Sequence, residues 1–371
     1  MKLLMITGYG GTRLAQGEKG AFFNTLEELK NYFEKIDIIA PKGSIAVSGK
    51  ETKVFDNVFI HCSDKNILLQ PFFIKRKGIE IFKKQKFEAM TVHEYPPFYN
   101  GIGANMLWNK IKIPFMSEIH HIPGYPRSAN IKERIYKLLS GILISSLTEN
   151  ASIIRVDNMS QVPPFLVKSG VDSAKIKLIS PFYIDFDVFN PTETEKKYDL
   201  MFAGRLSENK GLKLFLKVVE ESKSSAVIVG GGPLRDWLEK EVRRLNLSDR
   251  ITIKGWLENH TDVAKIINES KIFAMFSDNE GGPRVVLEAM ACGVPVVATP
   301  VGIVCDVIKE KYHGAVVNWD SKEIAQTVTK ILGEYDEVYW PKRFEISNYM
   351  KIFEKSKNII FYAGEIKDMA H

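Results

Sequence analysis

Short apolar runs alternate along the chain with segments of helical periodicity. The runs predict strands at Leu3–Thr7, Ile36–Ala40, Val54–Ile60, Phe87–His93, Phe115–Ile119 and Ser152–Val156, and then at Leu200–Ala203, Ala226–Gly230, Ile251–Lys254, Ile272–Phe276, Val294–Ala298 and Ala315–Val317. Such alternation is typical of parallel sheets covered by helices on both faces. The pattern therefore predicts an α/β protein with two doubly wound, Rossmann-like domains facing across a cleft.

The two series of strands are separated by Ser180–Lys197, a segment with two prolines and a charged tail that has the composition of an interdomain linker. We place an N-terminal, acceptor-binding domain at residues 1–185 and a C-terminal, donor-binding domain at 186–345. Residues 346–371 follow as a helix expected to pack back across the domain junction. Ligands of doubly wound domains bind at the carboxyl ends of the strands, so the cleft is the expected place for chemistry.

Composition supports two globular domains in a chain of 371 residues, 45% of them hydrophobic and 26% charged. The first residues resemble a strand rather than a signal peptide, and no apolar run is long enough to span a membrane. Three cysteines, Cys62, Cys292 and Cys305, form an odd set without metal-ligand spacing, which fits a reducing compartment. These features predict a cytoplasmic protein.

The net charge of +6 is unevenly distributed, with +7 on residues 1–190 (25 basic, 18 acidic) and −1 on the remainder (26 basic, 27 acidic). Basic and apolar residues interleave densely over Phe72–Phe87. This stretch is either a peripheral contact with the inner face of a membrane or an ordinary solvated helix face. No nucleic-acid motif accompanies the charge, so a nucleic-acid partner is not expected. The oligomeric state cannot be predicted.

The segment Ser277–Thr299, SDNEGGPRVVLEAMACGVPVVAT, carries the most specific chemistry. Glu280 precedes a glycine pair, and Glu288 lies within the helix that Pro283 opens. A strand end, a tight glycine loop and a helix N-terminus provide backbone N–H groups for a phosphate. Carboxylates repel phosphate but accept hydrogen bonds from hydroxyls, so two glutamates around a diphosphate site indicate a nucleotide-sugar. The residues expected to bind it here are Gly281, Gly282, Pro283, Arg284, Val285 and Glu288.

Two further glycine turns follow strands of the same domain. Gly204-Arg205-Leu206-Ser207-Glu208-Asn209-Lys210-Gly211 precedes a helix at Leu212–Glu221, and its two cations suit a diphosphate leaving group. The turn Val229-Gly230-Gly231-Gly232-Pro233-Leu234 admits a phosphate or a base at close range, although glycine turns of this kind are also common in loops. We therefore add Gly204, Gly230 and Gly231 to the donor-binding residues.

The N-terminal half offers weaker signals. Gly8–Arg13 superficially suggests a dinucleotide fingerprint, but Arg13 stands where the third glycine belongs and the next helical pattern begins near Gly20. Glu118-Ile119-His120-His121 ends a strand, where a histidine projects into the cleft and can donate a hydrogen bond. One of the two histidines can equally be structural. Adjacent histidines point in opposite directions on a strand, so no metal site is predicted.

Together these motifs resemble the retaining glycosyltransferases of the GT-B fold, specifically glycosyltransferase family 4. GRLSENKG, VGGGPL, ITIKGW and NEGGPRVVLEAMACGVPVVATPVG stand in that family's order and spacing, over most of the chain. The resemblance implies that Glu280 contacts the donor sugar and Glu288 the ribose. It also implies that Arg205 and Lys210 contact the diphosphate, and that the histidine at the site is His120 rather than His121. The turn Pro181-Phe182-Tyr183-Ile184-Asp185 departs from the family's usual sequence.

The implied reaction is a metal-independent transfer of a hexose from a nucleoside diphosphate sugar to an acceptor hydroxyl, with the anomeric configuration retained. His120, Arg205, Lys210 and Glu280 are the expected catalytic residues, with a UDP or GDP sugar as co-substrate and no other cofactor. The expected acceptor is a glycan, a lipid-linked molecule or a small molecule, as in envelope polysaccharide or glycolipid synthesis. The alternatives are an epimerase or hydrolase of nucleotide-sugars, a protein that binds them without turnover, and a dehydrogenase, which the incomplete fingerprint disfavours.

Overall fold

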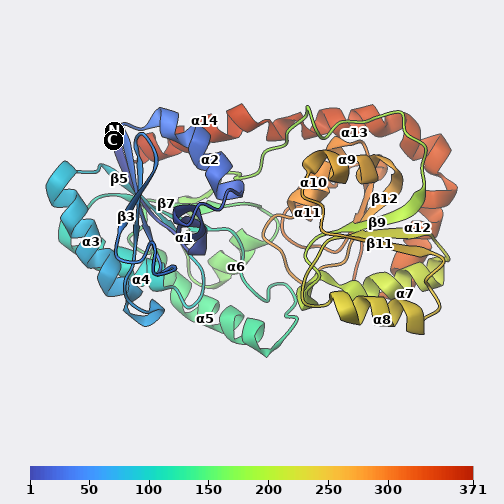
Figure 1. Cartoon of the computed structure of the whole chain (residues 1–371), viewed down its shortest axis with the longest axis horizontal. Helices are drawn as coiled ribbons and strands as arrows, with labels where there is room; N and C mark the ends of the chain where they lie inside the picture. Colours follow the sequence, from blue (N-terminus) through green and yellow to red (C-terminus); the bar gives the residue numbers. More distant parts are fainter. Residues whose placement is uncertain (371) are drawn as a thin grey trace. The chain divides into compact units, whose positions relative to one another are not determined.

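The computed structural model describes residues 1–370, which form two compact units. Unit 1 comprises residues 1–122, 135–181 and 356–370, and unit 2 comprises residues 123–134 and 182–355. Each unit is built on its own sheet, and the chain returns to unit 1 at its end (Figure 1). In the described part of the chain, no helix is both long and apolar enough to cross a membrane.

Unit 1 has its strands in the order β3-β4-β2-β1-β5-β6-β7-β8, parallel throughout except for the antiparallel pair β3 and β4. The strands are β1 (Lys2–Ile6), β2 (Lys35–Ala40), β3 (Glu51–Phe55), β4 (Val58–Cys62), β5 (Ala89–His93), β6 (Phe115–Ile119), β7 (Ile153–Val156) and β8 (Ile176–Leu178). The helices are α1 (Tyr9–Ala15), α2 (Ala21–Leu29), α3 (Gln70–Gln85), α4 (Tyr99–Ile111), α5 (Ile131–Thr148), α6 (Val162–Lys168) and α14 (Lys355–Ala370). The first four residues of α5 and the first residue of α14 belong to unit 2.

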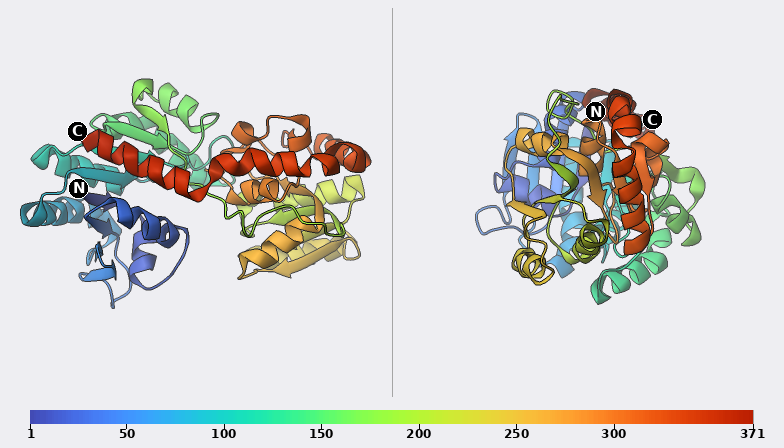
Figure 2. Two further views of the ribbon diagram at one scale, coloured as in Figure 1. Left: turned by 90° about the horizontal axis from the view of Figure 1, so that it is seen from above. Right: turned by 90° about the vertical axis from the view of Figure 1, so that its right-hand side faces the viewer.

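The sheet of unit 1 is buried on both faces, as its continuous apolar strands predict. Leu3 and Met5 of β1 pack in one core cluster with residues of α1, α2 and α14, whereas the intervening Leu4 and Ile6 point to the opposite face and are fully buried. The long last helix, α14, thus completes the core of the unit in which the chain begins (Figure 2).

Unit 2 has the strand order β11-β10-β9-β12-β13-β14, and its paired strands are all parallel in the described residues. The strands are β9 (Tyr198–Ala203), β10 (Ala226–Val229), β11 (Ile251–Gly255), β12 (Ser270–Met275), β13 (Val296–Ala298) and β14 (Gly314–Val316). The helices are α7 (Leu212–Ser222), α8 (Arg235–Arg244), α9 (His260–Asn268), α10 (Arg284–Ala291), α11 (Val304–Val307), α12 (Ser321–Gly333) and α13 (Arg343–Tyr349).

Alternate residues of β9 enter two different cores. Leu200 and Phe202 pack with α7, α8 and α12, and Met201 and Ala203 pack with α9, α10 and α13. Helices therefore cover both faces, as Figure 1 shows for α7 and α8 on one side of the sheet and α9 and α10 on the other. The predicted doubly wound α/β fold is confirmed in both units.

Three local predictions were wrong. The apolar run Val54–Ile60 is two antiparallel strands, because Asp56 and Asn57 form a turn within it. The strand β8 is short and largely exposed, so it left no apolar run to detect. A helix, α1, does begin directly after the first strand, where the glycine-rich sequence suggested a long loop. A methyl group at Gly11 would lie 3.1 Å from the Ala40 side chain, so α1 packs closely on the sheet there.

The basic stretch Phe72–Phe87 forms most of α3 and the turn after it. Phe73, Ile74, Ile81 and Phe87 are buried within unit 1, and Phe72 is exposed. Most of the apolar residues that suggested a membrane contact therefore belong to the core.

Candidate active site

The strand order of unit 2 reverses between β9 and β12, which are neighbours in the sheet. The chain leaves these two strands in opposite directions, so the loops at their carboxyl ends separate and leave a crevice. The loop after β9 is Gly204–Gly211, and the loop after β12 is Ser277–Pro283. The two most specific motifs of the sequence thus occupy the expected ligand position of the fold.

Lys210 and Glu280 meet at this crevice. The ammonium of Lys210 donates a short hydrogen bond to Oε1 of Glu280, which also accepts one from the Ser277 hydroxyl at 2.9 Å. Both side chains are mostly covered, with 22% of Lys210 and 14% of Glu280 exposed. An ion pair in such a position is held more firmly than a surface pair, and removal of one partner leaves a poorly solvated charge.

Glu288 lies on the second turn of α10, half-buried. Burial raises the pKa of its carboxyl, and the nearby Arg284 and His260 side chains offset only part of that rise. The carboxylate is therefore poorly solvated, and hydroxyl donors from a ligand would replace the lost hydration. The role of Glu288 as an acceptor for ribose hydroxyls stays a prediction.

A cavity of about 390 Å³ joins these features, a size typical of small-molecule sites. Of the predicted residues, it is lined by Gly204, Lys210, Gly230, Glu280, Gly282, Pro283, Arg284, Val285 and Glu288. Arg205, Gly231 and Gly281 belong to the same loops but not to the lining, and the side chain of Arg205 is exposed. His120 lies in unit 1. The structure thus brings together most of the predicted donor-binding residues within one unit.

Close packing of two loops explains the glycine at position 230, in the turn after β10. Gly230 has a φ of +145°, and a methyl group there would lie 1.9 Å from the carbonyl oxygen of Gly204. The backbones of the two loops are in contact, with Gly204 N–H donating to Val229 O at 3.0 Å and Leu206 N–H to Gly231 O at 2.9 Å. Gly230 therefore allows the β9 and β10 loops to form one continuous wall of the cavity.

Gly282 packs against the turn Pro181–Asp185. A methyl group at Gly282 would lie 1.9 Å from the Phe182 ring, which is buried. The guanidinium of Arg284 donates to Tyr183 O at 3.3 Å and lies 4.8 Å from the centre of the Tyr183 ring. The sequence suggested an interdomain linker here. In the structure, Phe182 packs against Gly282 and Tyr183 contacts Arg284, so both residues support the loop that carries Glu280.

The sequence reasoning missed one wall of the cavity. Trp256, Leu257, Glu258, Asn259 and His260, which follow β11 directly, also line it. This segment has no glycine pair or paired charges to mark it. The available signals were its position after a predicted strand and the motif ITIKGW, which ends at Trp256.

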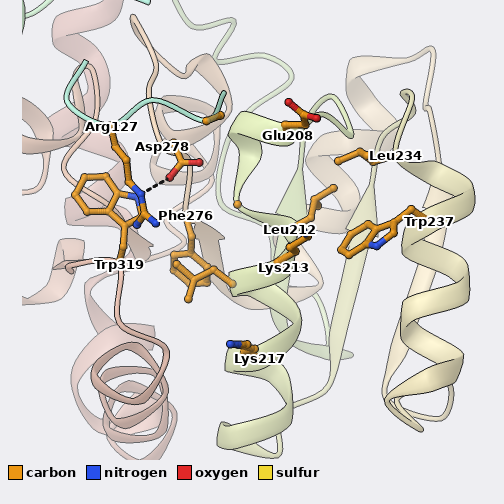
Figure 3. A pocket seen from close by; sticks show the side chains of 13 residues that line it. Arg127, Glu208, Leu212, Lys213, Lys217, Leu234, Trp237, Phe276, Asp278 and Trp319 are labelled. Carbon is orange, nitrogen blue, oxygen red and sulfur yellow. Dashed lines mark ion pairs between the residues drawn. The ribbon is translucent and has the colours of Figure 1, made fainter. Parts of the chain in front are cut away.

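A second groove, of about 500 Å³, is lined by residues of segment 123–134, of α7 and α8 and of the loop after β12 (Figure 3). Arg127 and Trp319 form one end, Trp237 lies beyond α7, and Nε of Arg127 lies 3.1 Å from an Asp278 oxygen. The Asn279 amide donates to Arg127 O at 3.0 Å and to the Glu133 carboxylate at 2.8 Å. Segment 123–134 therefore fixes the two residues that precede Glu280.

In unit 1, His120 lies at the carboxyl end of β6 and is paired with Asp157. Its Nδ1 lies 2.9 Å from both carboxylate oxygens of Asp157. Burial alone would lower the pKa of His120, but the charge and hydrogen bond of Asp157 outweigh burial and raise it. The neighbouring His93, whose ring centre is 4.8 Å from that of His120, has its pKa lowered to about 3 by burial and by the charge of His120.

The two histidines thus differ in protonation, with His120 favouring the imidazolium and His93 remaining neutral. The stabilisation from the His120–Asp157 pair is fully present below the ordinary histidine pKa of 6.5 and is lost as pH rises through the raised value. Asp157, which the sequence reasoning did not single out, raises the pKa of His120.

Replacing Asp157 by asparagine is expected to lower the pKa of His120, because the Glu118 charge alone would then oppose burial and the Arg155 charge. The titration of the imidazole protons can be followed by NMR in the wild type and in Asp157→Asn. A matched Asp172→Asn variant, changed at an exposed carboxylate, should leave the titration unaltered. An unchanged His120 midpoint in Asp157→Asn would contradict the assigned cause.

Comparison with known proteins agrees with this geometry. Residues 184–352, almost all of unit 2, match the family model of the glycosyl transferases group 1. Unit 2 is thus similar to the domains of this group. An uncharacterized glycosyltransferase of Methanocaldococcus jannaschii is 25% identical over 302 residues, which cover 75% of this chain and 74% of that protein. Its similarity extends beyond unit 2.

Two solved structures show that the chain has the GT-B fold. Sucrose-phosphate synthase from Thermosynechococcus elongatus has a TM-score of 0.80 at 15% identity, covering 100% of this chain and 99% of the other. HepE of Anabaena in complex with UDP and glucose has a TM-score of 0.71 at 15% identity, covering 99% and 100%. The predicted GT-B architecture is therefore confirmed.

Proposed function

We propose that this GT-B glycosyltransferase transfers a hexose from a nucleoside diphosphate sugar to an acceptor hydroxyl with retention of the anomeric configuration. The observation that supports the proposal most directly is the cavity that joins Lys210, Glu280 and Glu288 at the switch point of unit 2. It combines a cation, two carboxylates and the N-terminus of α10, which together suit a diphosphate flanked by two sets of hydroxyls.

The roles follow from the charges. In the transition state, negative charge grows on the departing diphosphate, and Arg205, Lys210 and the backbone N–H groups near Gly281 and Gly282 would stabilise it. These cations would provide the neutralisation without a divalent metal ion. The Lys210–Glu280 pair keeps Lys210 at the cavity before the donor binds. Glu280 then accepts hydrogen bonds from the donor sugar, and Glu288 from the ribose.

The identity of the donor, the contact made by His120 and the kind of acceptor are part of the same proposal. The donor is expected to be a UDP or GDP sugar, in keeping with the solved neighbour that holds UDP and glucose. His120, paired with Asp157, would donate a hydrogen bond to a sugar hydroxyl or to an anionic reaction centre. The acceptor would be a glycan, a lipid-linked molecule or a small molecule, and the enzyme would work in the cytoplasm.

A thermal-shift screen tests the donor site. UDP, GDP, ADP and CMP, with their sugar conjugates, are compared on the wild type, Glu288→Ala and Arg205→Ala. At a ligand concentration of 100 Kd, mass action stabilises the native state by about 2.7 kcal/mol. One nucleoside diphosphate is expected to raise the melting temperature of the wild type, and both variants should lose that shift.

Glu220→Ala, which removes an exposed carboxylate on α7, is the matched control and should keep the shift. A shift that survives in Glu288→Ala and Arg205→Ala would refute the assigned site. Turnover of the donor sugar without an acceptor would indicate a hydrolase or epimerase, and binding without turnover in the presence of acceptors would indicate a non-catalytic protein.

A further inference from the structure

A buried ion pair lies next to the His120–Asp157 pair in the sheet of unit 1. Glu118 on β6 and Arg155 on β7 are paired in register, and Nη1 of Arg155 donates to Oε1 of Glu118 at 2.6 Å. The Glu118 side chain is 8% exposed and that of Arg155 5%. His120 and Asp157 each follow one of these residues by two positions. They therefore project from the same face of the sheet and form the next pair toward the carboxyl ends of the strands.

The charges of the two pairs alternate. Glu118 and Asp157 are negative, whereas Arg155 and His120 are positive, so each charge has an opposite charge both on the neighbouring strand and along its own strand. Burial would raise the pKa of Glu118, but the charges of Arg155 and His120 outweigh burial and lower it. The four charges thus stabilise one another in a place mostly closed to water.

The C-terminal helix closes this cluster. The Tyr362 hydroxyl of α14 donates to Oε1 of Glu118 at 2.6 Å, and the guanidinium of Arg155 lies 3.9 Å from the centre of the Tyr362 ring. Nε of Arg155 donates to Ile179 O at 2.9 Å. Both members of the Glu118–Arg155 pair are therefore fixed from more than one side, at a constant position relative to His120.

A purely structural role explains the Glu118–Arg155 pair poorly. Apolar side chains of similar size often stabilise a core as well as a buried ion pair does, because the loss of hydration offsets the attraction between the two charges. The place of the pair, adjacent to His120 on the same face of the sheet, gives a reason for two charges here.

Asp157 determines which nitrogen of His120 carries a proton. A carboxylate only accepts hydrogen bonds, so Nδ1, which lies 2.9 Å from both Asp157 oxygens, is the protonated nitrogen of a neutral ring. Nε2 then carries a proton only in the imidazolium. His120 can therefore donate a hydrogen bond to a ligand from Nε2 only while the ring is charged, and the surrounding groups control that charge.

The titratable groups around His120 come from four elements of unit 1. They are His93 at the end of β5, Glu118 of β6 with the adjacent His121, Arg155 and Asp157 at the end of β7, and Tyr362 of α14 behind Glu118. Besides burial and Asp157, the Arg155 charge lowers the pKa of His120 and the Glu118 charge raises it. Loss of either member of the pair therefore leaves the influence of the other unbalanced.

We propose that Glu118 and Arg155 are positioning residues for the transfer reaction, which act through His120, and that Tyr362 holds them in place from the C-terminal helix. The inference rests on the role proposed for His120. It extends the site from the end of the sheet into the core of unit 1, and it gives α14 a part in the reaction.

NMR titration of the imidazole protons in the full chain tests the proposal, with the His120 signal identified by its loss in His120→Asn. Glu118→Gln should lower the pKa of His120, and Arg155→Gln should raise it. Each of these variants leaves a buried charge without its partner and is expected to be less stable. Glu118→Gln/Arg155→Gln removes both charges, and its His120 midpoint should lie between those of the two single variants.

Two controls distinguish an effect of charge from a loosening of the fold. Tyr362→Phe removes the hydrogen bond to Glu118 but keeps all four charges, so it should lower the melting temperature and leave the His120 midpoint near that of the wild type. Asp172→Asn, changed at an exposed carboxylate, should alter neither. An unchanged His120 midpoint in Glu118→Gln and Arg155→Gln would overturn the proposal, and so would equal shifts in Tyr362→Phe and Glu118→Gln.

The pH dependence of turnover connects the titration with the reaction. Release of the nucleoside diphosphate from the donor selected by the thermal-shift screen should be lost as pH rises through the His120 midpoint. The loss should occur at a lower pH in Glu118→Gln and at a higher pH in Arg155→Gln than in the wild type. A pH profile that did not follow the NMR midpoints would overturn the proposal, since the pair would then act on His120 without affecting the reaction.

The nucleotide thermal shift tests the donor site separately. It should be the same in the wild type and in all these variants, since none of the changed residues is among the described residues that line the donor cavity. No shift in the wild type would refute the donor site without altering the result of the titration.

Discussion

Lys210→Ala is expected to reduce turnover of the donor by about 10²–10³-fold, the loss typical when one group that stabilises transition-state charge is removed. The ammonium of Lys210 lies at the cavity, within hydrogen-bonding contact of Glu280. Release of the nucleoside diphosphate from the donor selected by the thermal-shift screen provides the measurement. Lys240→Ala, at an exposed position of α8, is the matched control and should leave turnover unchanged.

A double variant distinguishes an effect on turnover from an effect on the free energy of unfolding. Lys210→Ala leaves the Glu280 carboxylate mostly buried with only the Ser277 hydroxyl as a donor, so the free energy of unfolding should also fall. Lys210→Ala/Glu280→Gln removes the unpaired charge and should recover stability without recovering turnover. If turnover returned together with stability, Lys210 would be a structural residue and its role in the reaction would be refuted.

The sequence predicted the arrangement of strands well because most strands of the two sheets are parallel and buried on both faces. Buried parallel strands appear as continuous apolar runs, and the loops after them can be located without knowing how the strands pair. The motifs at Lys210, Glu280 and Glu288 stand at such strand ends, and the structure brings all three to one cavity.

What the sequence could not predict depends on contacts between distant segments. Nothing in the sequence around Phe182 indicates that its ring packs on Gly282, a hundred residues later. The same is true of Asn279, which binds Arg127 and Glu133 of segment 123–134. The turn at Asp56 and Asn57 was also missed, because the apolar residues on either side of it suggested one uninterrupted strand.

The contact between Phe182 and Gly282 makes a second prediction of large effect. Gly282→Ala places a methyl group within 1.9 Å of the Phe182 ring. Overpacking of this kind typically costs about 1–3 kcal/mol, and the displaced loop carries Glu280. We expect Gly282→Ala to lower the free energy of unfolding by that amount and to abolish the nucleotide thermal shift. Urea denaturation and the thermal-shift screen measure the two effects.

The cause can be isolated with a compensating change. Phe182→Leu shortens the side chain that the methyl group meets, so Phe182→Leu/Gly282→Ala should be more stable than Gly282→Ala and should regain part of the nucleotide shift. Gly333→Ala is the matched control, since a methyl group there meets no described atom within 4 Å. If the two changes were simply additive, the effect of Gly282→Ala would have to arise from the backbone of the loop. Recovery in the double variant would instead show that the turn at Phe182 positions the loop that carries Glu280.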